Sequence, residues 1–156
     1  QAATTMISQN AGKGLIKRSS EVITRCLIMV TVICGVVFTL VHLIPNSIFN
    51  AFGAEESVII CGIPYLLAFS FEYVGVPFII SANAFLTGTG RGWVILIITL
   101  CASFLFRIPV AYLLGFTLKM GIVGVAYSIP IATLAGAIFS WGCYLAFKNK
   151  PLGKIN

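Results

Sequence analysis

The chain alternates between long apolar runs and short polar hinges. Each run reaches the ~20 residues that a helix needs to cross a ~30 Å hydrocarbon core. The sequence does not show the strand-length alternation of apolar and polar positions that is typical of an outer-membrane barrel. The pattern therefore predicts an all-α membrane protein with four transmembrane helices, at residues 22–44, 58–86, 93–116 and 122–147.

Composition supports a membrane protein and argues against other classes. Of the 156 residues, 59% are hydrophobic and 9% are charged, whereas soluble domains are roughly 25% charged. The mean hydropathy is +1.05. The formal net charge of +6 is concentrated at the ends of the runs, without a basic face that carries stacking aromatics, so nucleic-acid binding is not expected. The five cysteines lie inside apolar runs beside a single histidine in the chain, which predicts neither disulfides nor a metal site.

Lysine and arginine residues indicate the orientation of the spans. Hinges on one side of the predicted membrane hold more of them than hinges on the other, and the positive-inside rule assigns the basic side to the cytoplasm. We therefore predict a multi-pass protein of the plasma (inner) membrane with both chain ends in the cytoplasm. Residues 45–57 and the hinge with Lys119 then lie outside. The basic residues of the predicted cytoplasmic side are Lys13, Lys17, Arg18, Arg91, Lys148, Lys150 and Lys154.

Two runs contain residues that interrupt a regular helix. Gly75 and Pro77 predict a kink in the second run, because proline lacks the N–H of the helical hydrogen bond. In the third run Pro109 follows Arg107 and frees the carbonyl of Leu105. An arginine at mid-span costs about 2.5–3.5 kcal/mol unless it faces protein or water. We expect Arg107 to be an internal staple that holds the kinked helix, with direct substrate contact as the alternative.

Glu72 is an acidic residue deep inside the second run. It lies fourteen residues from both Val58 and Leu86, too far to reach either membrane surface. Its carboxyl group must therefore be protonated, paired or exposed to a wet cavity. Two interpretations are open: a site for H⁺, Na⁺ or a cationic substrate, and a permanent ion pair with Arg107.

Polar residues near Glu72 predict a wall of a cavity. Asn83 lies eleven residues after Glu72, close to three helical turns, so the two side chains share a face. Ser81 is a neighbour of Asn83, and Thr99 and Ser103 in the third run are four residues apart. We expect these residues to form a polar cavity face. The alternative is that Asn83 caps a helix or hydrogen-bonds between helices.

The hinge TGTGRG resembles a dinucleotide-binding turn only superficially, because a membrane helix precedes it. We expect Gly88 and Gly90 to form a tight cytoplasmic turn, with Arg91 available to lipid phosphates.

Small residues recur at every fourth position in the last run. Ala132, Gly136 and Ser140 predict one face of close helix packing.

The sequence assembles no catalytic group of the Ser-His-Asp, Cys-His or paired-carboxylate kind. We therefore expect a protein that is not an enzyme and needs no resident cofactor.

Four segments in series resemble one transporter family. They are ISQNAGKG with a following KR pair, FEYVGVPFIISANAFLTGTGRG, FRIPVAYLLG and GIVGVAYSIPIA. Together they are similar to the multidrug and toxic compound extrusion (MATE) transporters over nearly the whole chain. The resemblance implies twelve helices in two six-helix lobes around a central cavity. It also implies export of organic, often cationic, compounds in exchange for Na⁺ or H⁺, with no cofactor besides the coupling ion.

The Arg-Ile-Pro element resembles the second lobe of that family. It implies that the chain is the last four helices of the C-terminal lobe plus the end of the preceding helix. Because the chain begins with Gln1 rather than Met, we expect a fragment whose partners are membrane lipid and an N-terminal lobe of the same protein. In some MATE sequences a similar Phe-Glu stands in this helix, and in other branches an acidic residue lies about one turn further on, so the resemblance implies an acidic ion site in this helix without fixing it at Glu72. The alternatives are a lipid-linked oligosaccharide flippase of the same superfamily, and a structural membrane protein that transports nothing.

Overall fold

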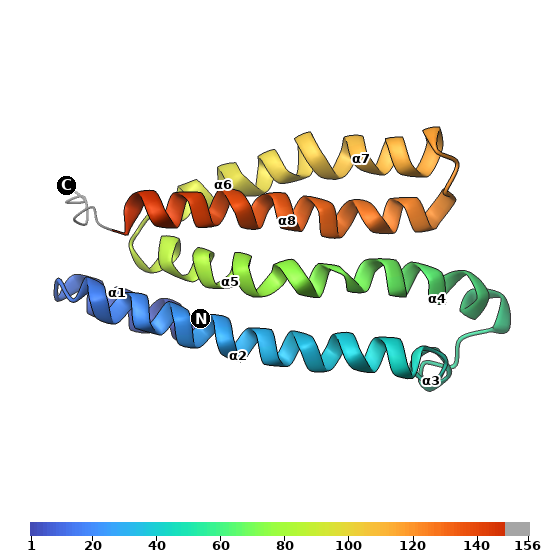
Figure 1. The fold of residues 1–156 in the computed structure, drawn as a ribbon, viewed down its shortest axis with the longest axis horizontal. Helices are drawn as coiled ribbons and strands as arrows, with labels where there is room; N and C mark the ends of the chain where they lie inside the picture. Colours follow the sequence, from blue (N-terminus) through green and yellow to red (C-terminus); the bar gives the residue numbers. More distant parts are fainter. Residues whose placement is uncertain (149–156) are drawn as a thin grey trace.

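The computed structural model describes residues 1–148, and this part of the chain is built from helices (Figure 1). Within residues 1–148 no strand occurs. Lys150 and Lys154 of the predicted basic tail lie outside the described residues. The helices are α1 (Ala2–Gly12), α2 (Ile16–Leu43), α3 (Pro45–Ala51), α4 (Glu56–Ser70), α5 (Glu72–Gly88), α6 (Gly92–Cys101), the π-helical η1 (Ala102–Arg107), α7 (Ile108–Tyr112), the π-helical η2 (Leu113–Thr117) and α8 (Gly121–Phe147).

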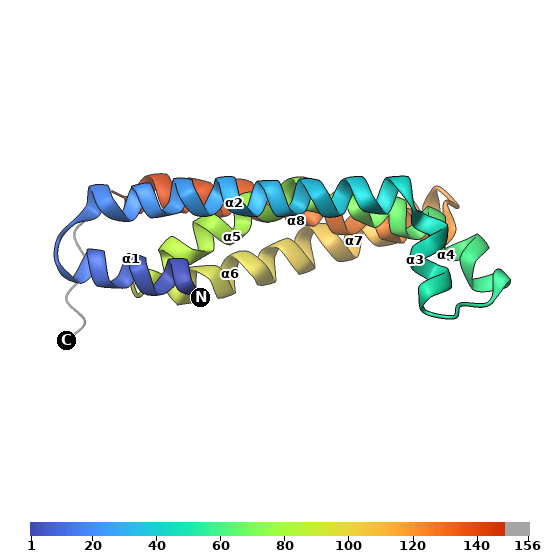
Figure 2. The same ribbon diagram turned by 90° about the horizontal axis from the view of Figure 1, so that it is seen from below.

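The long helices lie side by side in one layer, in the order α2, α5, α8 and α6–α7 (Figure 1). α4 extends α5 toward the end of the layer where α3 lies. α1 folds back along α2, on the side of the layer on which α6 also lies (Figure 2). α5 contacts both α2 and α8, so it occupies the centre of the layer.

By length and composition the helices are suited to cross a membrane. α2, the continuous helical stretch Gly92–Thr117 and α8 have mean hydropathies of 2.6, 2.3 and 1.9 over their most apolar windows. α4 and α5 pass the same test only together, as a pair bent by 43°. Helices suit a membrane because each backbone N–H and C=O finds its partner inside the segment. The prediction of an all-α membrane fold is confirmed. The described residues contain three helices that could each span a membrane, and a fourth span if the bent α4–α5 pair crosses the membrane as a single span.

The irregular helical segments lie in the runs that contain proline, but the helices do not break at the proline residues themselves. The bend between α4 and α5 falls at Phe71, and Pro77 lies inside α5. Pro109 lies in the short α7, between the π-helical segments η1 and η2. Proline has no N–H to donate to the carbonyl of Leu105 one turn earlier. A wider π-type turn on each side of α7 replaces the regular ladder in this span.

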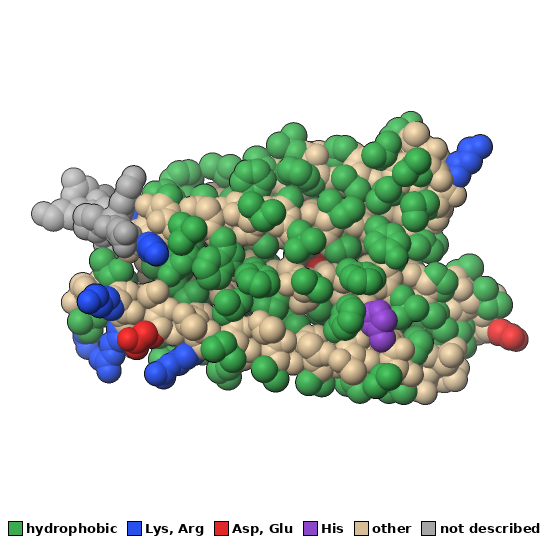
Figure 3. Space-filling view, in the orientation of Figure 1, with side chains coloured by type: hydrophobic (Ala, Val, Ile, Leu, Met, Phe, Trp, Pro, Cys, Tyr) green, Lys and Arg blue, Asp and Glu red, His purple; other side chains and the backbone are tan. Residues whose placement is uncertain are grey.

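The buried core lies toward one end of the layer. Ile7, Ile23, Leu86, Ile98 and Tyr144 come from α1, α2, α5, α6 and α8 and belong to one buried cluster. Most Lys and Arg side chains in view gather at the same end, around α1 and the start of α2 (Figure 3). We call it the basic end: α1, the start of α2, the α5–α6 turn and the last turns of α8. The end with α3, α4, α7 and η2 is the opposite end.

Candidate functional site

Glu72 is the first residue of α5, directly after the break at Phe71. Its side chain is half-buried, and its Oε1 accepts a hydrogen bond of 3.1 Å from Thr133 Oγ1 on α8. A carboxylate in the first turn of a helix is favoured by the positive end of the helix dipole. The structure therefore places the carboxyl group of Glu72 at the break point of the bent pair, against α8.

Arg107 is not the partner of Glu72 in this structure. It lies at the junction of η1 and α7, and its side chain is exposed. Within residues 1–148 no hydrogen bond or ion pair holds its guanidinium, and the hydrogen-bond donor to Glu72 is a threonine. The staple role of Arg107 stays a prediction, because the described residues supply no group for it to hold.

A second polar contact joins the same two helices further along. Ser140 Oγ on α8 donates to Asn83 Oδ1 on α5 at 3.1 Å, and Ser140 is fully buried. Since Glu72 and Asn83 both bond to α8, they lie on one face of α5, as eleven residues of helix require. We call Glu72, Asn83, Thr133 and Ser140 the polar seam.

The other residues expected on the cavity wall lie elsewhere. Ser81 precedes Asn83 by two residues, about 200° around a helix, so it points to the other side of α5. It is fully buried, and its Oγ has no hydrogen-bond partner among the described residues. Thr99 is exposed on α6, and Ser103 is half-buried in η1. The structure thus joins Asn83 to Glu72 through α8 and leaves these three residues outside the polar seam.

Small residues let α5 and α8 approach closely along the polar seam. A Cβ on Gly75 would lie 3.0 Å from Thr133 Cγ2, and a Cβ on Gly136 would lie 3.1 Å from Ile79 Cδ1. Both glycines are buried. The packing places Glu72 and Asn83 within hydrogen-bond reach of the short side chains of α8. It is the kind of contact that small-residue stripes support in membrane proteins.

Aromatic contacts continue the polar seam toward the basic end. Trp141 Nε1 donates to the Phe78 carbonyl at 2.9 Å. The Tyr144 ring packs edge-on against Phe85, with ring centroids 4.9 Å apart. The Tyr144 hydroxyl lies 3.0 Å from Ser20 Oγ on α2. α8 is therefore bonded to α5 and to α2 near the same end of the layer.

The predicted turn after α5 packs tightly rather than standing free at the surface. A Cβ on Gly88 would lie 2.8 Å from Ile7 Cγ2 of α1. Gly90 has a φ of +75°, a left-handed conformation that favours glycine. The Arg91 guanidinium lies over the Phe147 ring, 4.7 Å from its centroid, which is a cation–π contact. The turn therefore closes the basic end against α1 and α8.

Sequence reasoning missed Thr133 and undervalued Ser140, which it assigned to packing alone. The available signal was their spacing of seven residues, two helical turns, which puts two hydroxyls on one face of α8. Within residues 1–148 no group of three or more His, Cys, Asp or Glu side chains is placed to hold a metal ion. The polar seam is thus a site of one carboxylate, one amide and two hydroxyls.

Comparisons with known proteins give one family match and one similar fold. A family model described as MatE matches residues 1–113. The fold is similar to a solved structure described as the inward-facing conformation of a multidrug resistance MATE family transporter of the MOP superfamily, with a TM-score of 0.83 and 20% identity. That similarity covers 97% of this chain and 36% of the transporter, so the chain spans about a third of its length. A comparison with curated proteins gives no match.

Proposed function

This chain belongs to the MATE family, and we propose on that premise that it forms part of a secondary active transporter. The transporter exports drugs or other organic compounds, often cationic ones, in antiport with H⁺ or Na⁺. Further helices complete the pathway, and we assign them to an N-terminal lobe of the same protein. The MATE family consists of transporters, so the prediction that the chain is not an enzyme is confirmed.

The observation that carries the proposal is the position of Glu72. It is half-buried and lies sixteen residues from both Glu56 and Gly88, the ends of the bent α4–α5 pair. It has a hydroxyl donor in Thr133, and within residues 1–148 it has no cationic partner. A carboxylate at that depth is tolerated when it is protonated, bound to a cation or hydrated in a cavity. An ion-coupled carrier alternates between these states.

We place the basic end in the cytoplasm and the protein in the plasma membrane. The charge distribution supports this orientation, because Lys13, Lys17 and Arg18 lie at the α1–α2 connection. The start of α4 at the opposite end carries Glu55 and Glu56 instead. Under the positive-inside rule both chain ends then face the cytoplasm.

The test is efflux as a function of pH and Na⁺ by the complete protein carrying Glu72→Gln or Glu72→Asp. We expect Glu72→Gln to abolish ion-driven efflux at unchanged protein level, because an amide neither releases a proton nor balances a cation. Glu72→Asp keeps the carboxyl group and retains part of the activity. The matched control Glu56→Gln removes an exposed carboxyl group at the start of α4 and leaves efflux unchanged. Wild-type efflux by Glu72→Gln would exclude Glu72 as the coupling charge.

A further inference from the structure

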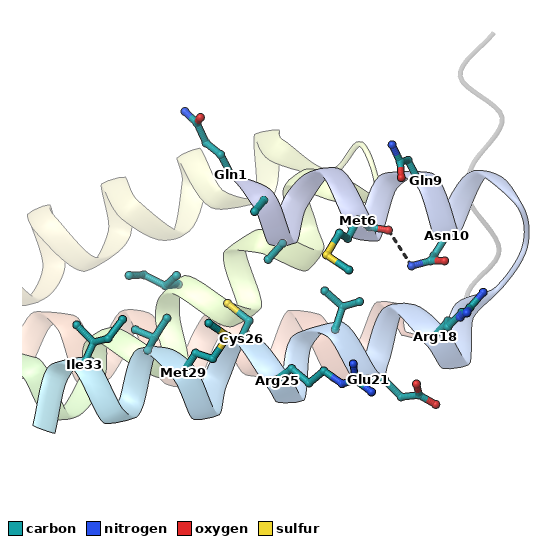
Figure 4. A pocket seen from close by; sticks show the side chains of 15 residues that line it. Gln1, Met6, Gln9, Asn10, Arg18, Glu21, Arg25, Cys26, Met29 and Ile33 are labelled. Carbon is teal, nitrogen blue, oxygen red and sulfur yellow. Dashed lines mark hydrogen bonds between the residues drawn. The ribbon is translucent and has the colours of Figure 1, made fainter.

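A hollow of about 790 Å³ lies between α1 and α2 at the basic end, and Ile80 of α5 forms part of its wall. Figure 4 shows Met6 of α1 and Cys26 of α2 pointing into the space between the two helices, and Ile33 lying further along α2, beyond the first residue of α1. Gln1 points away from that space. The middle of the hollow is therefore an apolar slot between two helices, separate from the polar seam.

Charged side chains line this slot from its end at Arg18 to its middle at Arg25. Arg18, Glu21 and Arg25 follow each other at spacings of three and four residues, so they share one face of α2. Within residues 1–148 neither guanidinium forms an ion pair with Glu21. The three groups carry a net charge of +1, and Lys13 and Lys17 stand nearby on the chain. The mouth of the slot thus presents two arginines to an anion, with one carboxylate between them.

The length of the slot matches one leaflet of a bilayer. Fifteen residues of α2 separate Arg18 from Ile33, about 22 Å at 1.5 Å per residue. Half of a ~40–45 Å bilayer, headgroups included, is about 20–22 Å. The charged and apolar parts follow the same order as in a lipid, because Arg18 lies in the first turn of α2, Arg25 lies two turns further along, and Met29 and Ile33 are deeper still. Among residues 1–148 Met29 and Ile33 are 66% and 60% exposed, and no described side chain prevents their contact with an acyl chain.

We propose that this hollow binds one anionic phospholipid from the leaflet at the basic end. The phosphate accepts hydrogen bonds from Arg18 and Arg25, and one acyl chain lies along Cys26, Met29 and Ile33. Paired arginines suit a phosphate because their planar forks donate several charge-assisted hydrogen bonds. A net negative headgroup is selected because the mouth is net positive, and basic pockets between membrane helices are known sites for such lipids. A free phosphate would leave the apolar slot uncovered.

The test is native mass spectrometry of the complete, delipidated protein in detergent with added dioleoyl phosphatidylglycerol. We expect one lipid molecule retained per protein. The double variant Arg18→Gln, Arg25→Gln lowers the affinity about tenfold or more, because it removes two charge-assisted partners. The matched control is Lys17→Gln, which removes one exposed positive charge of α2 outside the hollow and changes the affinity less than about threefold.

A second pair of variants tests the apolar slot. Met29→Trp fills it and weakens binding, whereas Ile28→Trp places the same ring on an exposed position of α2 outside the hollow and has no effect. Equal melting temperatures of the variants show that the fold is intact. Equal affinity for dioleoyl phosphatidylcholine, or displacement of the lipid by inorganic phosphate, would overturn the proposal. The proposal would also be overturned if the complete protein retained no lipid and the Met29→Trp variant lost stability. That result would mean that residues preceding Gln1 fill the hollow.

Discussion

The basic end and the opposite end of the helical layer both contain many large apolar side chains but pack them differently. At the basic end five helices contribute to one buried cluster, in which Ala82 and Leu86 have no exposed surface. Neither α3, α4, α7 nor η2 contributes a residue to that cluster. Large apolar side chains of the opposite end are exposed instead, with Phe52 86%, Phe116 70% and Tyr112 66% accessible.

The comparison shows at which end the helices of this chain are held together by contacts with one another. Lipid tails are as apolar as leucine, so association of membrane helices depends on close packing and interhelical hydrogen bonds. The basic end has both, through Gly88 against α1 and Tyr144 against Ser20. At the opposite end the exposed rings need lipid or other protein to cover them. The bend at Phe71, between α4 and α5, separates the loosely packed opposite end from the closely packed basic end.

The largest effect is expected from Gly88→Ala, which would break the packing of the basic end. The new Cβ would lie 2.8 Å from Ile7 Cγ2 and 2.9 Å from the Thr4 carbonyl oxygen, so α1 and α5 must separate. Overpacking of this kind costs about 1–3 kcal/mol. Thermal unfolding of the purified complete protein measures it.

The control for this change is Gly92→Ala in α6, where nothing lies within 4 Å of the added Cβ. It should leave the melting temperature unchanged. If both substitutions lowered it equally, the close approach of α1 and α5 would not be what stabilises the basic end.

A smaller loss is expected from Tyr144→Phe, which removes the hydroxyl that bonds to Ser20 Oγ at 3.0 Å. The ring stays packed on Phe85, so the change isolates one hydrogen bond, worth about 0.5–1.5 kcal/mol. A double-mutant cycle with Ser20→Ala measures the coupling free energy between α8 and α2. Tyr112→Phe, an exposed tyrosine of the opposite end, should have no effect. Equal losses at Tyr144 and Tyr112 would contradict the difference between the two ends.

The smallest effect is expected from Ser140→Ala in the polar seam. The variant removes the donor to Asn83 Oδ1 and fits the same space, so we expect a loss of about 0.6 kcal/mol, the average for hydrogen bonds between membrane helices. Denaturant unfolding in detergent micelles resolves a difference of this size when the two proteins are measured in parallel. Thr39→Ala serves as control, because Thr39 is exposed and bonds within α2 to the Gly35 carbonyl. No difference between Ser140→Ala and the control would mean that the polar seam orients side chains without stabilising the fold.

The sequence determined the class of fold and the existence of its spans, because the length of an apolar run decides whether a helix can cross a membrane. The helix of the first predicted span extends beyond the apolar run at its basic side. α2 begins at Ile16, six residues before the predicted start, because Lys17, Arg18 and Glu21 continue the helix beyond its apolar part. The kink of the second span was also predicted, whereas its location at Phe71 was not. Pro64 and Pro77 each remove a backbone hydrogen bond from that stretch of helix, and packing against the other helices decides where the helix bends.

The shared face of Glu72 and Asn83 followed from the sequence alone, because helical spacing fixes which residues of one helix point the same way. The identity of the neighbour on that face did not. Chain order favoured the following span and Arg107, yet α8 lies against α5 and presents Thr133 and Ser140. The hollow beside Arg25 likewise exists only because α1 folds back along α2. Periodicity is a property of a single helix, whereas the partner of each face is chosen by how all the helices pack together.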